Sequence, residues 1–108
     1  MSSLVRRAER AIAVGDSVQG NPTHAARAYA RGLDLLLAHC MLAAAATCAD
    51  TQPLRALAFL QRVERAAGRV HAALPIAAAA YQALGQPRIA RAFLNAAARP
   101  RALERVVA

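Results

Sequence analysis

Two stretches of sequence decide the fold. The first is Gly20-Asn21-Pro22, which leads into Ala28-Tyr29-Ala30-Arg31-Gly32-Leu33-Asp34-Leu35-Leu36-Leu37, and the second is Phe59-Leu60-Gln61-Arg62-Val63-Glu64-Arg65-Ala66. Asn is a favoured N-cap residue, and Pro suits the first helical position because the N–H that it lacks has no intrahelical partner there. The first stretch therefore predicts a helix that begins at Pro22 and continues to about Ala49. From Leu35 onward this helix is apolar nearly all round, which indicates contacts on more than one side.

Helix signals recur on both sides of this segment. Apolar residues at i, i+3, i+4 spacing predict a first helix from about Ser3 to Val14. The run 50–53 repeats the start signal, a capping residue followed by Pro53, and predicts a third helix that continues until Pro75 interrupts it. Beyond Pro75 we expect helices over 76–84 and 88–98, with a short terminal segment.

Composition supports an all-α protein. Thirty-one of the 108 residues are Ala, four are aromatic and none is Trp, and Ala is the residue with the highest helix propensity. No segment alternates apolar and polar residues in the manner of a strand. We predict an antiparallel three-helix bundle of spectrin-like up-down-up order over residues 1–74, with a helical C-terminal extension or linker of one or two short helices over 75–108.

The net charge is +8 with neutral His, from 14 Arg, no Lys and six acidic residues. Such a chain attracts acidic peptides, anionic lipid or nucleic acid. On one helix, Cys40 and Cys48 would lie about 12 Å apart, too far for a disulfide, so we expect reduced thiols and a cytoplasmic protein. The N-terminus lacks the apolar run of a signal peptide. The uncharged runs 35–49 and 70–87 are not convincing membrane spans, and we expect no transmembrane segment.

No pattern in the sequence predicts an enzyme. The six carboxylates are dispersed singly, so no local pair suggests acid and base catalysis. A Gly-rich phosphate loop is missing, and the His and Cys residues show no recognised metal-ligand spacing. We therefore expect neither a catalytic site nor a metal or other cofactor.

The third helix carries the candidate binding residues. Arg55, Arg62 and Arg69 recur every seven residues and line one face, where they could hold acidic groups or simply face solvent. Leu57 and Leu60 form an apolar stripe separate from that of Phe59 and Val63. This second stripe could form the wall of a binding groove, or it could pack beneath the C-terminal extension.

Residues 4–74 resemble an MIT (microtubule-interacting and trafficking) domain, the three-helix module of vacuolar-sorting AAA ATPases and other trafficking proteins. The interval from the capping Asn21 to Tyr29 matches that of the family, and the interval from Tyr29 to Phe59 differs by at most one residue. The family's helix-3 phrase, aromatic-Leu-x-Arg-x-Glu, is present over 59–64. Residues 75–108 lie outside the resemblance.

The resemblance implies a non-catalytic adaptor that recognises C-terminal tails of ESCRT-III-type subunits in endosomal sorting. MIT domains bind such tails as a helix between helices 2 and 3, or as a strand between helices 1 and 3. Leu57 and Leu60 would then be apolar contacts and Glu64 the partner of an arginine in the tail, while Arg55 and Arg62 would meet its acidic residues. A AAA ATPase or another domain in the same parent protein, and recruitment to endosomal membranes, are further expectations of this kind.

The sequence is also compatible with two other functions. The segment around Tyr81-Gln82-Ala83-Leu84-Gly85 and Phe93 resembles half of a tetratricopeptide unit, which suggests a helical scaffold or chaperone that acts by self-association. A basic bundle could also bind polyanions. We do not expect nucleic acid as the partner, because the four aromatic residues look like core residues rather than base-stacking platforms.

Overall fold

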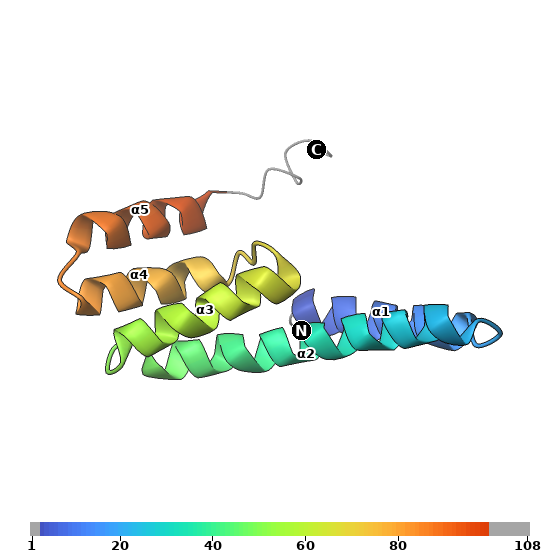
Figure 1. Cartoon of the computed structure of the whole chain (residues 1–108). Coiled ribbons are helices and arrows are strands. Elements are labelled where there is room, and N and C mark those ends of the chain that lie inside the picture. The colour runs from blue at the N-terminus through green and yellow to red at the C-terminus, as the bar shows by residue number, and fades with distance from the viewer. Residues whose placement is uncertain (1–2, 100–108) are drawn as a thin grey trace.

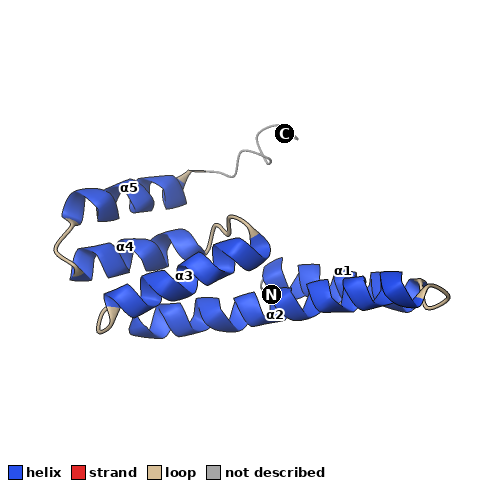
Figure 2. Cartoon of the chain, viewed as in Figure 1, coloured by secondary structure: helices blue, strands red, loops and turns tan. Residues whose placement is uncertain are grey.

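Five helices make up the computed structural model, which describes residues 3–99. They are α1 (Ser3–Ser17), α2 (Pro22–Cys48), α3 (Pro53–Ala67), α4 (Ala73–Ala83) and α5 (Pro87–Ala98). Short loops join them, and no strand occurs in the described part of the chain (Figure 2). The expected all-α class is confirmed.

The predicted helix starts at Pro22 and Pro53 are confirmed, and the Asn21 side chain accepts a hydrogen bond from the His24 backbone N–H at 3.1 Å. The capping residue expected before α3 is wrong, because the N-cap residue there is Gln52 and its side chain makes no capping hydrogen bond. The first helix runs three residues beyond its predicted end, and its last residue, Ser17, bonds through its hydroxyl to the Val14 carbonyl at 2.8 Å.

The predicted end of the third helix is wrong. We expected it to continue to Pro75, but α3 ends at Ala67, because Gly68 adopts a φ of 76° that favours glycine. Pro75 instead lies in the first turn of α4, where its missing N–H interrupts no helical bond. The predicted division of the chain between residues 74 and 75 therefore falls inside a helix.

α1 and α3 pack one after the other along the long α2 (Figure 1). A helix of 27 residues is about 40 Å long, whereas α1 and α3 have 15 residues each. α1 packs along the N-terminal half of α2, with Ile12 over Gly32, and α3 packs along the C-terminal half. The first three helices do alternate in direction, but α1 and α3 do not lie side by side as they would in a closed three-helix bundle.

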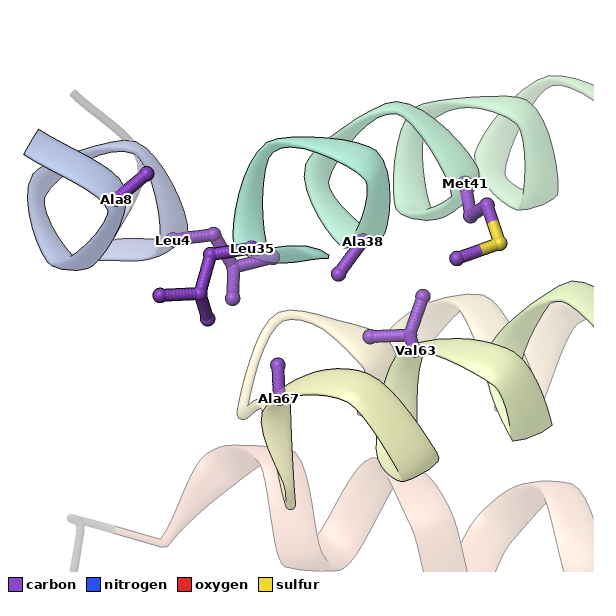
Figure 3. Close-up of a cluster of buried hydrophobic side chains, with 7 residues drawn as sticks. All are labelled: Leu4, Ala8, Leu35, Ala38, Met41, Val63 and Ala67. Carbon is purple, nitrogen blue, oxygen red and sulfur yellow. The ribbon is translucent and has the colours of Figure 1, made fainter. Parts of the chain in front are cut away.

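The main core lies where these three helices meet (Figure 3). Leu4 and Ala8 from the start of α1 approach the end of α3, and the middle of α2 lies between them. The fully or nearly fully buried members are Leu4, Ala8, Leu35, Ala38, Met41, Val63 and Ala67. This junction joins the two ends of the molecule.

A second core, rich in alanine, attaches the C-terminal helices. Ala45 of α2, Ala49 just after its end, Ala56 of α3 and Ala80 of α4 are buried together. α5 then packs on α4, where the rings of Tyr81 and Phe93 stack with centroids 5.4 Å apart. Helices thus contact mainly their neighbours in the chain, and the molecule is elongated, 54 × 36 × 20 Å.

Candidate peptide-binding surface

Arg55 and Arg62 lie on the exposed face of α3, as the sequence predicts. The guanidinium carbon of Arg55 lies 5.7 Å from the centroid of the Phe59 ring, within the range of a cation–π contact. Phe59 itself is half-buried and contacts both cores. The aromatic residue of α3 therefore links the protein interior to the basic surface.

The remaining arginines of this region extend the same surface. Arg65 and Arg69 are exposed, and Arg65 lies in the last turn of α3. Within residues 3–99, no carboxylate forms an ion pair with any of the four arginines; Arg55 has a side-chain partner in Gln52, at 3.4 Å. Arg69 follows Gly68, beyond the end of α3, so the predicted row of three arginines on one helix is wrong at its third member. We define Arg55, Arg62 and Arg65 of α3, together with Arg69 just beyond it, as the arginine face. It can accept several carboxylates at once.

Leu57 and Leu60 occupy a different environment from the one that a groove would provide. Both are half-buried and pack into the alanine-rich core, which α4 completes with Ile76, Ala79 and Ala80. Of the two arrangements that the sequence left open, the structure shows packing beneath the C-terminal extension. Glu64 is exposed one turn beyond Leu60. The structure thus brings Arg55 and Arg62 together on an open face and places the two leucines against α4.

Sequence reasoning did not identify Arg31 as a functional residue, although it lies within the stretch 28–37 that predicts the second helix. Its guanidinium donates to the Ala66 carbonyl, at 2.5 Å, across 35 residues of chain. This carbonyl is in the last turn of α3, where helix carbonyls lack intrahelical donors and a cation is favourable. Arg31 therefore fastens α2 to the end of α3.

A row of exposed leucines on α2 was also missed. Leu33, Leu36 and Leu37 expose 67%, 36% and 56% of their surface. We had expected contacts on more than one side of this segment, but α1 and α3 both leave these leucines open. The signal that could have found them is the spacing of apolar residues along the helix.

A cluster of hydrogen-bonded polar side chains lies at the turn between α1 and α2. The Tyr29 hydroxyl donates to Asp16 and accepts from the Gln19 amide. The hydrogen bond to Asp16, with some desolvation, raises the pKa of Tyr29 above its ordinary value. This contact therefore contributes to stability below about pH 10, the unfolded-state pKa, and the contribution is lost as pH rises through the raised folded-state pKa.

Within residues 3–99, no group of three or more His, Cys, Asp or Glu side chains is placed to hold a metal ion. Cys40 and Cys48 are both free thiols. α2 is long and apolar enough to cross a membrane by length and composition, and 28% of its 18-residue apolar window is buried inside the protein. A core helix of a soluble protein meets the same two criteria.

Comparison of the chain with protein-family models, with curated proteins and with solved structures finds no match.

Proposed function

We propose that the protein is a non-catalytic adaptor that binds an acidic peptide segment along the arginine face. The observation that carries this proposal is the group of four exposed arginines, which have no ion-pair partner in the described part of the chain. Arg55 and Arg62 are seven residues apart, about 10 Å along the helix. A partner with carboxylates on one face of a helix, at similar spacing, would match them.

The energetics favour a modest affinity. An exposed ion pair contributes about 0.2–1 kcal/mol, so a single contact cannot hold a peptide. Four arginines, with bidentate geometry where it can form, supply several such contacts at once. We expect dissociation constants in the micromolar range.

The more specific partner is an ESCRT-III-type tail, as the MIT resemblance implies, in a cytoplasmic protein recruited to endosomal membranes. In this form of the proposal Arg55 and Arg62 meet the acidic residues of the tail. A helix that docked on Leu57 and Leu60 would have to displace α4, so we place the tail on the open arginine face instead. Glu64 is exposed and accessible to a basic residue of the tail.

A second candidate function is a tetratricopeptide-like scaffold. The packing of α3 on α4, and of α4 on α5, favours it, because successive helices contact their chain neighbours as in helical repeat arrays. Concentration-dependent size would support this alternative.

The test is an NMR titration of labelled protein with ESCRT-III C-terminal peptides at physiological salt. We expect shifts at Arg55 and Arg62 that saturate for some peptides and not for a charge-matched scramble. Arg62→Glu replaces attraction by repulsion and should weaken binding about tenfold. Arg88→Glu, an equal change of charge on α5, is the control and should leave binding unchanged.

Two results would contradict the proposal. Equal shifts with the scramble and a steep loss of affinity with salt would indicate a polyanion-binding protein without sequence preference. Unchanged binding by Arg62→Glu would remove the arginine face from the site. Leu60→Asp is a poor test, because Leu60 packs in the alanine-rich core and its loss would disturb the fold.

A further inference from the structure

A row of cationic groups on one side of α3 continues beyond Arg62. Arg55 and Arg62 are seven residues apart, and Ala66 follows one turn after Arg62. Intervals of seven and four residues keep positions on one side of a helix. The guanidinium of Arg31 donates to the Ala66 carbonyl at 2.5 Å, and therefore lies at the next position of this row.

Arg31 occupies the place in the row that the sequence predicts for Arg69. The predicted row has its third member at Arg69, but α3 ends at Ala67, so Arg69 lies beyond the helix. Arg31 belongs to α2 and reaches the same end of α3 across 35 residues of chain. A different helix thus contributes the third cation of the row.

We propose that Arg31 is a specificity-determining residue of the acidic-peptide site, where it binds the third carboxylate of a helical peptide; this inference rests on the proposed function. The carboxylates that meet Arg55, Arg62 and Arg31 should be spaced i, i+7 and i+11 along the peptide, over about 16 Å. Two helices that lie side by side with the same spacing bring each carboxylate opposite one guanidinium.

Arg31 retains the hydrogen-bonding capacity that such a contact needs. A guanidinium has five N–H donors, and the bond to Ala66 uses one of them. Arg31 is exposed, and no carboxylate within residues 3–99 forms an ion pair with it. Because the bond to Ala66 already holds the guanidinium in place, Arg31 loses less side-chain entropy on binding a peptide than an unattached arginine would.

The charge of Arg31 also determines which ligands the end of α3 attracts. The last carbonyls of a helix together carry about half a negative elementary charge, which repels an anion. The guanidinium of Arg31 adds a full positive charge at that point. The end of α3 therefore favours an acidic group only while Arg31 is present.

The first test asks whether the full wild-type chain recognises this spacing. One alanine- and glutamine-based peptide, about 24 Å long when helical, carries Glu at i, i+7 and i+11. A second peptide has its third Glu at i+9, on the opposite side of the helix, so the two peptides have equal charge. Fluorescence anisotropy should show about three- to fivefold tighter binding of the first peptide. Equal affinities that Arg62→Glu lowers alike would overturn this proposal and leave the proposed function standing, whereas no binding of either peptide would overturn both.

The second test assigns the third carboxylate to Arg31. Arg31→Gln should weaken binding of the first peptide about three- to fivefold, and should leave the affinity for a peptide with Gln at i+11 unchanged. A purely structural role would lower both affinities equally, and that result would overturn the proposal. Arg27→Gln, an equal change of charge at an exposed position one turn earlier on α2, is the matched control. It should leave the difference in affinity between these two peptides as it is in the wild type.

Discussion

At the residue scale, the contact of Gly15 with Tyr29 can be tested with one methyl group. A Cβ added at Gly15 would lie 2.6 Å from the Tyr29 Cε1 atom, and the ring is held by Asp16 and Gln19. Although Ala favours helices over Gly, we expect the clash to dominate, so that Gly15→Ala lowers Tm by about 4–8 °C. Gly20→Ala is the control, since nothing lies within 4 Å of its added Cβ. An unchanged Tm for Gly15→Ala, measured by circular dichroism, would show that the ring moves freely.

At the element scale, the attachment of α4 depends on alanines that leave no room for larger side chains. Ala80 is fully buried against α2 and α3. We expect Ala80→Leu to destabilise the protein by about 1–3 kcal/mol, the usual cost of overpacking. Ala83→Leu adds the same atoms to an exposed position of α4 and should have little effect. Chemical denaturation measures both, and equal stabilities would mean that the alanine-rich core can expand.

At the scale of the whole molecule, stability should decrease from the centre to the ends. Within residues 3–99, α5 packs on α4, and the His71 side chain donates a hydrogen bond to the Ala97 carbonyl of α5 at 2.9 Å. α2 packs against both α1 and α3. Amide hydrogen exchange should therefore be fastest in α5 and slowest near Leu35 of α2. Phe93→Ala should speed exchange in α5 without changing α2; equal acceleration in every helix would indicate a single cooperative unit.

The sequence predicts helix starts better than helix ends and helix partners. Asn21, Pro22 and Pro53 act locally, through the chemistry of the first turn, and so can be read without tertiary structure. The predicted end of α3 is wrong because we placed it at Pro75, whereas the helix ends where Gly68 adopts a positive φ. The placement of α1 and α3 in succession along α2 depends on relative helix length and on which apolar faces meet, and no local pattern expresses this.

The candidate site, like the fold, could be predicted from the sequence only in part. Exposure of Arg55 and Arg62 follows from the seven-residue repeat of charge on α3. The environment of Leu57 and Leu60 does not, because an apolar stripe can face either a ligand or a neighbouring helix. The structure shows that α4 packs against this stripe. Arg31 could not have been identified, since its bond to the Ala66 carbonyl spans 35 residues.

The two tyrosines are placed so that ultraviolet spectroscopy can observe each end of the molecule separately. Tyr29 lies near the turn between α1 and α2, and Tyr81 stacks on Phe93 in the α4–α5 hairpin at the opposite end (Figure 1). The chain has no Trp to mask their emission. Replacing either one by Phe leaves a single fluorophore. Thermal melts of the two single-tyrosine proteins would therefore record the opening of each end without any added label.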